Sequence, residues 1–279
     1  MYVAILLLSG LSLSAHADPA ARYIYLASTQ GHFPPYHWYD AENKKPQGYT
    51  HKIISLLGEQ LGFELQINEN NSPLHEVVNL SLQNLISGQS DLAFSPQGAI
   101  SNNDNVVVVE EPIHTAKTKI FFLKNNKINY QQWSDLKPHV GGFLIGHMFS
   151  GDLDFDRYVK QSLQVKYYSN YKSMVKALLD GEVDYLLGMT RPTWFELQLL
   201  GGRGAVDTSD EVVTQLNIHV LISKHSSLAL QAKKIDGLLR GYRKNGRMSL
   251  LINQAIQEHA SYRNLMAQKG KGSAAHPLH

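Results

Sequence analysis

The sequence has no cysteine among its 279 residues. That absence excludes disulfide bonds, thiolate metal sites, cysteine nucleophiles and a lipid anchor on an N-terminal cysteine. Beyond the N-terminal apolar run, which ends at Leu13, no segment of the sequence is apolar enough to cross a membrane. Lysine and arginine are dispersed and the net charge is only +2, so the composition does not indicate a nucleic-acid-binding surface. The length suits one large domain or two small ones.

The N-terminal residues have the pattern of a secretory signal peptide. Val3 to Leu13 form an apolar run that is short for a bilayer span, and Ala15-His16-Ala17 is a small-residue cleavage site. The lysine or arginine that commonly precedes such a run is missing. We expect residues 1–17 to be removed, which would place the mature protein outside the cytoplasm, most simply in a periplasm.

The stretch from Gln30 to Phe63 begins with an aromatic loop and continues as an amphipathic helix. Its first half is predicted to be a loop, because Pro34, Pro35 and Pro46 fix φ and remove backbone donors. The loop follows a predicted buried strand, Tyr23–Ala27, and open α/β sheets bind ligands at the carboxyl ends of their strands. The loop aromatics are therefore predicted to line a binding site, although they could instead only close the edge of the domain.

Two segments in different halves of the chain repeat one pattern. Asn84–Ala93 and Lys176–Leu187 each contain a helix that ends at glycine, a short turn, and an aspartate that leads a buried strand. This repetition predicts two similar α/β lobes, each a mainly parallel sheet flanked by helices. Crossing strands at Lys117–Leu123 and Leu216–Ser223 would join the lobes around a cleft that can close by a hinge motion. The predicted boundaries are 1–17 for the signal peptide, 18–123 and 216–267 for lobe 1, 124–215 for lobe 2, and 268–279 for a disordered tail.

Short motifs occur along the chain in a recognisable order, from about Tyr23 to Ala260. They are Phe33–Tyr36, Gly48-Tyr49, Leu61-Gly62, Leu85–Asp91, Glu111–Ile113, Asp135-Leu136 and Gly181–Asp184. Together they resemble bacterial extracellular solute-binding protein family 3, the receptors of polar amino acid uptake systems. The resemblance implies a two-lobed fold of the type II periplasmic-binding-protein kind, with two hinge strands. It also implies a monomer without cofactor or enzymatic activity that captures a small polar solute for a membrane ABC transporter.

The positions that bind amino acids in the family differ in this sequence. The family's Ile-Thr-x-x-Arg phrase, whose arginine clamps the ligand carboxylate, aligns with Ile100–Asp104 and ends in an acid. The Gly-Thr pair of the second lobe aligns with Gly146-His147. The acidic residue that holds the ligand ammonium aligns with Met189, and a second acidic position aligns with Lys52. A free amino acid held in the family's usual way is therefore not expected.

The predicted ligand site lies on the strand-end loops of both lobes. Aromatic faces suit a planar or cationic solute. Asp104 could pair with a cation and Arg191 with an anion, but Asp104 could also be a solvated loop residue and Arg191 a helix cap or structural ion pair. The predicted ligand-binding residues are Phe33, Tyr36, Trp38, Ser95, Gln97, Ser101, Asp104, Gly146, His147, Ser150 and Arg191.

Two other functions stay open at this point. The resemblance also includes secreted dehydratases that act on cyclohexadienyl acids, but no carboxylate and histidine stand at a spacing that suggests a general acid. The histidines do not repeat as His-x-x-x-His, and no Gly-x-Ser-x-Gly elbow is present, so neither a metal site nor a serine hydrolase is predicted. The same lobes could instead serve as a sensor or as a ligand-free interaction module.

Overall fold

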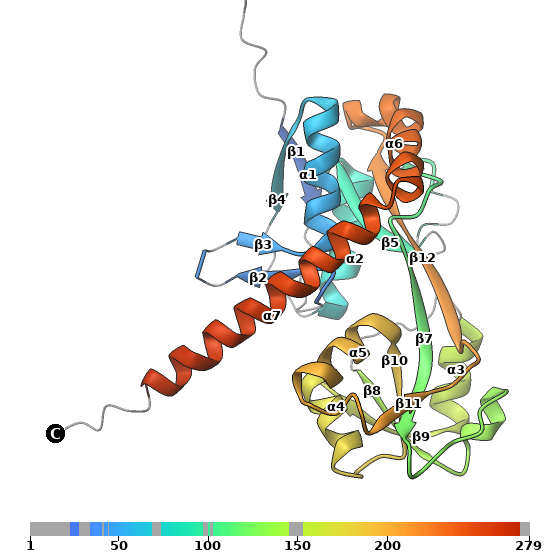
Figure 1. Cartoon of the computed structure of the whole chain (residues 1–279). Coiled ribbons are helices and arrows are strands. Elements are labelled where there is room, and N and C mark those ends of the chain that lie inside the picture. The colour runs from blue at the N-terminus through green and yellow to red at the C-terminus, as the bar shows by residue number, and fades with distance from the viewer. Residues whose placement is uncertain are drawn as a thin grey trace, which may run out of the picture.

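The computed structural model describes residues 23–27, 34–40, 42–43, 45–68, 74–96, 100, 103–144 and 153–273. Its elements form two lobes joined by two long strands (Figure 1). The predicted signal peptide, residues 1–17, lies outside these ranges. The two-lobed α/β arrangement agrees with the fold predicted from the repeated helix–turn–strand pattern.

Lobe 1 is built on three parallel strands. These are β1 (Tyr23–Ala27), β4 (Glu64–Asn68) and β5 (Leu92–Pro96), in the order β4-β1-β5. A short strand, β6 (Val106–Val108), pairs with the returning strand β12. The helices of this lobe are α1 (Tyr49–Leu61), α2 (Leu74–Ser87) and α6 (Ala232–Lys244), with the 3-10 turn η3 (Ser227–Gln231) before α6.

Lobe 2 repeats this plan. Its parallel strands are β8 (Val140–Leu144), β9 (Gln164–Tyr168) and β10 (Tyr185–Met189), in the order β10-β8-β9. The helices are α3 (Leu153–Ser162), α4 (Tyr171–Leu179) and α5 (Thr190–Leu199), with the 3-10 turn η2 (Trp133–Leu136) ahead of the sheet. A short strand, β11 (Val206–Thr208), pairs antiparallel with β7.

The lobes are connected by β7 (His114–Leu123) and β12 (Thr214–Ser223), which run antiparallel. Where they cross, His114 is paired with Ile218 and Thr118 with Thr214. β12 also pairs with β5 of lobe 1, and β7 also pairs with β10 of lobe 2. Hydrogen bonding is therefore continuous from one lobe to the other. Both strands begin earlier than predicted: β7 starts at His114 instead of Lys117, and β12 starts at Thr214 instead of Leu216.

The repeated pattern has a physical basis in two glycines. Gly88 follows α2 with φ of 78°, and Gly181 follows α4 with φ of 73°. This left-handed conformation ends a helix and is costly for residues with a side chain. In lobe 2 the aspartate after the glycine has a clear role, because the Asp184 carboxylate accepts a hydrogen bond from Val140 N at 2.7 Å. This bond ties the start of β10 to the start of β8.

The aromatic stretch differs from its predicted form in one respect. Instead of a continuous loop, β2 (Trp38–Asp40) and β3 (Lys45–Gln47) form a two-stranded antiparallel ribbon. The Asp40 carboxylate holds the turn by accepting hydrogen bonds from the backbone N–H groups of Glu42 and Asn43. A two-stranded ribbon has only edge strands, so it tolerates the missing N–H of Pro46.

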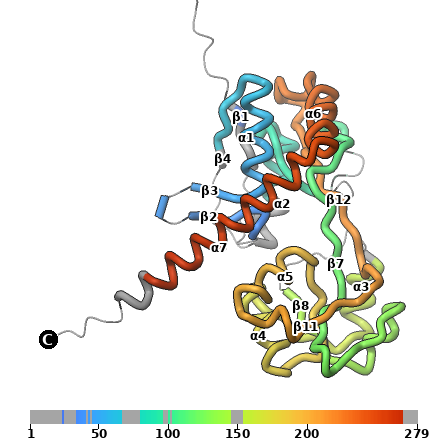
Figure 2. Tube along the Cα trace, in the orientation of Figure 1, coloured from blue at the N-terminus to red at the C-terminus, as the bar shows by residue number. Residues whose placement is uncertain are grey.

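The C-terminal helix is longer than predicted. α7 (Arg247–Ser273) continues beyond Glu258, where the closing helix was expected to end, and beyond Gln268, where a disordered tail was expected to begin. Figures 1 and 2 show it leaving lobe 1 and projecting, at its C-terminal end, away from both lobes. Its middle part contacts α5 of lobe 2, where the Arg263 guanidinium donates to both Glu196 carboxylate oxygens at 2.8 and 2.7 Å. α7 is thus a second connection between the lobes, in addition to the crossing strands.

Candidate functional site

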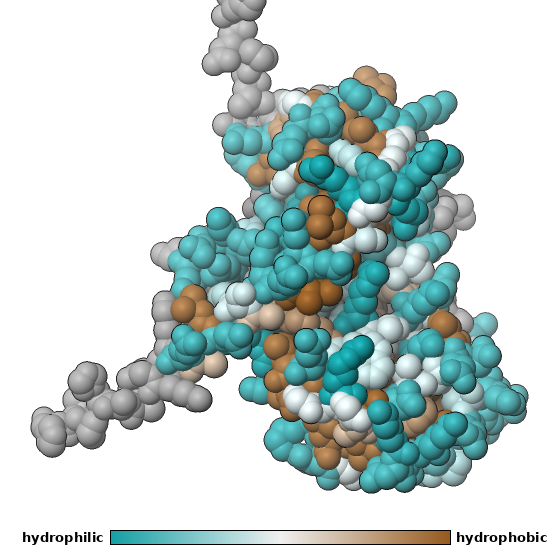
Figure 3. Space-filling model, in the orientation of Figure 1, coloured by the Kyte–Doolittle hydropathy of each residue, from teal (hydrophilic) through white to brown (hydrophobic). Residues whose placement is uncertain are grey.

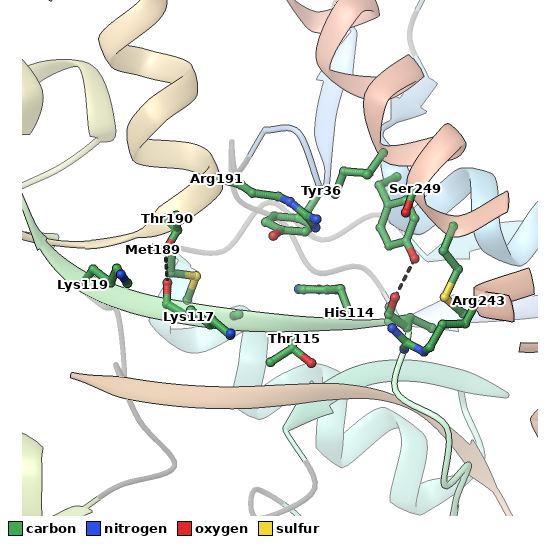
Figure 4. A pocket seen from close by; sticks show the side chains of 15 residues that line it. Tyr36, His114, Thr115, Lys117, Lys119, Met189, Thr190, Arg191, Arg243 and Ser249 are labelled. Atoms are coloured by element: carbon green, nitrogen blue, oxygen red, sulfur yellow. Dashed lines mark hydrogen bonds between the residues drawn. The ribbon is translucent and has the colours of Figure 1, made fainter. Parts of the chain in front are cut away.

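A cavity of about 420 Å³ lies between the lobes. Its wall combines Tyr36 of lobe 1, the first residues of β7, the start of α5 in lobe 2, and the α6–α7 region (Figure 4). This volume is within the usual range for small-molecule sites. The face in Figure 3 is mainly hydrophilic on both lobes, with apolar residues gathered between them.

Tyr36 is fixed by the first turn of α1. Its backbone carbonyl accepts hydrogen bonds from Thr50 N at 3.0 Å and from Thr50 Oγ1 at 2.9 Å. Gly48, just before the helix, has φ of 116°, and a Cβ at this position would lie 2.4 Å from the Tyr36 carbonyl oxygen. Only glycine fits this conformation and this close approach. The Gly48-Tyr49 motif therefore sets the position of Tyr36 at the cavity.

The lobe 2 wall is formed where β10 ends and α5 begins. The Thr190 hydroxyl, in the first turn of α5, donates to the Lys117 carbonyl of β7 at 2.8 Å. A Cβ on Gly188 would lie 2.2 Å from Thr193 Oγ1, so glycine allows the strand to approach the helix closely. These contacts place Arg191 at the cavity beside the crossing strand.

The cavity wall is rich in positive charge. It includes Lys117, Lys119, Arg191 and Arg243, and no aspartate or glutamate occurs among its described lining residues. Two of the four cations are held by groups that do not line the cavity. The Arg243 guanidinium pairs with Glu111 and donates to the Pro112 carbonyl. The Lys119 ammonium donates to the carbonyl oxygens of Ser209 and Asp210 at 2.7 and 2.9 Å.

Lys117 and Arg191 differ from Arg243 and Lys119 in their surroundings. Neither forms an ion pair with a carboxylate in the part of the chain that the structure describes, and both side chains are exposed. In Figure 4, Arg191 lies beside the Tyr36 ring, with His114 and Lys117 around the same space. Burial raises the pKa of the Tyr36 phenol, and the charge and hydrogen bonding of Arg191 offset part of that rise.

His114 is stacked on Tyr36, with ring centroids 4.1 Å apart and an interplanar angle of 19°. Burial, followed by the nearby charges of Arg191, His37 and Arg243, lowers the pKa of His114 from 6.5 to about 3. Its Nδ1 atom is buried and has no hydrogen-bond partner among the described residues. His114 is therefore a neutral part of the cavity wall at physiological pH.

This lowered pKa predicts a loss of stability in acid. The unfolded chain, with an ordinary histidine pKa, binds more protons than the folded protein between pH 6.5 and 3, so His114 reduces the free energy of unfolding as the pH falls through this window. The slope is at most about 1.4 kcal/mol per pH unit. Urea unfolding of wild type and His114→Phe at pH 7, 6 and 5 should show a shallower decline for the variant, which keeps the stacked ring without the titrating group. Parallel declines would contradict the prediction.

The structure brings only some of the predicted site residues together. Tyr36 and Arg191 both line the cavity. Trp38 is 3% exposed and packs in the core of lobe 1 instead. The Ser95 hydroxyl is buried in β5 and makes no hydrogen bond to residues within the described ranges. Asp104 is exposed in the turn before β6. The other predicted residues lie outside the described ranges: Phe33, Gln97, Ser101, Gly146, His147 and Ser150.

Several wall residues were not predicted. His114 and Lys117 lie in or just before the predicted crossing strand, and Arg243 belongs to a closing helix. The alternation of Lys117 and Lys119 along the strand is the one sequence signal that marks a charged face there. Nothing in the sequence indicates that this face meets the start of α5.

A family model for the bacterial extracellular solute-binding proteins, family 3, matches residues 26–258. The chain belongs to this family. Among curated proteins, none matches this solute-binding protein at a significant level. The predicted family assignment is thus confirmed over most of the chain.

Solved structures show the same fold at low sequence identity. The GluR0 ligand-binding core in complex with L-glutamate has a TM-score of 0.63 and 11% identity, covering 86% of this solute-binding protein and 99% of that chain. A histidine kinase sensor domain with similarity to periplasmic binding proteins has a TM-score of 0.59 and 14% identity, with coverages of 84% and 95%. The Streptococcus pneumoniae protein AbpA bound to L-arginine, an ABC transporter substrate-binding protein, has a TM-score of 0.58 and 18% identity, with coverages of 87% and 96%.

Within the described ranges, no helix combines the length and the apolar character needed to span a bilayer. The same ranges contain no group of histidine, cysteine, aspartate and glutamate side chains arranged to hold a metal ion.

Proposed function

We propose that this protein is a periplasmic receptor that captures a small polar solute between its lobes and delivers it to a membrane ABC transporter. One observation carries the proposal: the cavity wall is shared between Tyr36 of lobe 1 and Thr190 and Arg191 of lobe 2. A solute in contact with both walls stabilises the closed arrangement of the lobes, which is the form that a transporter can distinguish from the open one. The family assignment supports the same function.

We propose that the solute is bound and released unchanged. The described cavity wall offers hydrogen-bond donors and positive charge but no carboxylate that could act as a general acid or base. His114 is neutral at physiological pH, and its ring is stacked against Tyr36. This wall is suited to holding a solute through fixed donors. Recovery of the bound compound intact after incubation with the protein would support binding, and turnover would contradict it.

A thermal-shift screen of the protein lacking residues 1–17 tests solute capture directly. The library contains amino acids, polyamines, opines, small organic acids and aromatic acids. A solute at about 100 times its dissociation constant stabilises the native state by about 2.7 kcal/mol. For a chain of this size the melting temperature should rise by about 5–10 °C. If no compound class raises the melting temperature, the receptor function loses its support and the sensor or ligand-free alternative gains it.

A further inference from the structure

The described cavity wall has an unbalanced charge. Arg243 and Lys119 are engaged by Glu111 and by two backbone carbonyls, but Lys117 and Arg191 have no carboxylate partner within the described ranges. These two side chains come from different elements, the crossing strand β7 and the first turn of α5. The hydrogen bond from Thr190 to the Lys117 carbonyl holds these elements together. Lys117 and Arg191 thus line one cavity wall from elements that are far apart in the sequence, and neither has a carboxylate partner among the described residues.

The position of Arg191 is unfavourable for the helix itself. The N-terminus of a helix carries a partial positive charge and is stabilised by acidic residues. The first turn of α5 has no acidic residue and contains Arg191 instead. Residues that break a local rule of stability are expected at functional sites. An anion between Arg191 and Lys117 would compensate both the guanidinium and the positive end of the helix.

The wall also disfavours a cationic or zwitterionic solute. An ammonium group would need a carboxylate, and none occurs among the described lining residues. One face of the Tyr36 ring is covered by His114 at a centroid distance of 4.1 Å, with Arg191 next to the same ring. The aromatic face that could have attracted a cation is therefore already in contact with other groups, one of which is itself positively charged.

Building on the proposed receptor function, we propose that the solute is a small organic dianion with two carboxylate groups and no amino group. Arg191 holds one carboxylate, because its planar guanidinium can donate to both oxygens. Lys117 holds the other as a point charge. Met189, the last residue of β10, lines the cavity with an apolar side chain, so this position offers no carboxylate to an ammonium group.

Isothermal titration calorimetry with a charge series tests this assignment. The probes are glutarate, its amino derivative L-glutamate, the five-carbon diamine cadaverine, and inorganic phosphate. Wild-type protein should bind glutarate at least tenfold more tightly than L-glutamate and should not bind cadaverine. Since both cations are exposed, the affinity for glutarate should fall as NaCl is raised. Arg191→Gln and Lys117→Gln should each weaken glutarate binding at least tenfold. Lys172→Gln, which removes an exposed cation of α4 outside the cavity wall, should leave it unchanged.

The outcomes separate this inference from the receptor function. Binding of cadaverine or of an ordinary amino acid in preference to all organic anions would overturn the dianion assignment and leave solute capture intact. Glutarate binding that neither Arg191→Gln nor Lys117→Gln weakens would also overturn it, because the anion would then be held elsewhere. Phosphate binding that depends on both residues, without glutarate binding, would replace the dicarboxylate by an inorganic anion. No binding by any probe or library compound would overturn both proposals.

Discussion

Replacing Trp38 with alanine is expected to lower the free energy of unfolding by about 3–5 kcal/mol, the usual loss for truncating a buried aromatic side chain. Trp38 is 3% exposed in the main core of lobe 1, and its ring packs edge-on against His259 of α7, with centroids 4.8 Å apart. His259 is itself fully buried and contacts Phe195 of α5 in lobe 2. Removing the Trp38 ring should therefore also weaken the packing of α7 against lobe 2.

Tyr39 provides a matched control for this prediction. It is the next residue of the same short strand, but its side chain is 44% exposed. Tyr39→Ala should change the free energy of unfolding by less than about 0.5 kcal/mol, as is usual for exposed positions. Both variants can be measured by urea denaturation. If Trp38→Ala unfolds like the wild type but binds solute more weakly, Trp38 belongs to the ligand site, as the sequence alone suggested.

The second large effect is expected from Arg263→Ala. This change leaves the Glu196 carboxylate, which is only 5% exposed, without its partner. Removing one member of a buried ion pair costs about 3–5 kcal/mol when both groups are buried. Because the Arg263 side chain is 26% exposed, water can partly replace it, and we expect about 2–3 kcal/mol. Chemical denaturation measures the loss.

Two controls make the Arg263 result interpretable. Arg157→Ala removes the arginine of an exposed pair with Asp154 at 3.2 Å and should cost at most about 1 kcal/mol. A double variant, Glu196→Leu with Arg263→Met, replaces the pair by apolar groups and should recover most of the stability, because no buried charge is left unpaired. A double variant as unstable as Arg263→Ala would show that the loss of stability comes from packing and not from the unpaired Glu196 carboxylate.

The same pair joins the two lobes, since Arg263 lies on α7 and Glu196 on α5. Solute-dependent closure of the lobes must keep or break this contact. The His259–Phe195 contact, with centroids 5.3 Å apart, lies next to it along α7. We therefore expect α7 to restrict the hinge motion that β7 and β12 alone would permit.

The sequence by itself determined the order of the helices and strands and the family to which the chain belongs. The apolar periodicities and the glycines after each repeated helix predict the two α/β lobes, because helix ends need a left-handed residue and buried strands need continuous apolar runs. Gly88 and Gly181 satisfy the first condition with φ of 78° and 73°. The Gly48-Tyr49 motif is explained in the same local way, since a Cβ on Gly48 would collide with the Tyr36 carbonyl. Such requirements act between residues that are close in the chain, so a single sequence reveals them.

Only the tertiary structure decided which side chains share the cavity. The aromatic loop offered several candidates of equal standing, and packing placed Tyr36 in the cavity wall and Trp38 in the core beside His259. No local pattern connects Lys117 with Arg191, which are far apart in sequence and line one cavity wall because β10 pairs with β7 and Thr190 bonds to the Lys117 carbonyl. The site is formed by contacts of long sequence separation, and its charge depends on which cations find carboxylates elsewhere. The net charge of the site is therefore a property of the folded molecule and not of any segment of its sequence.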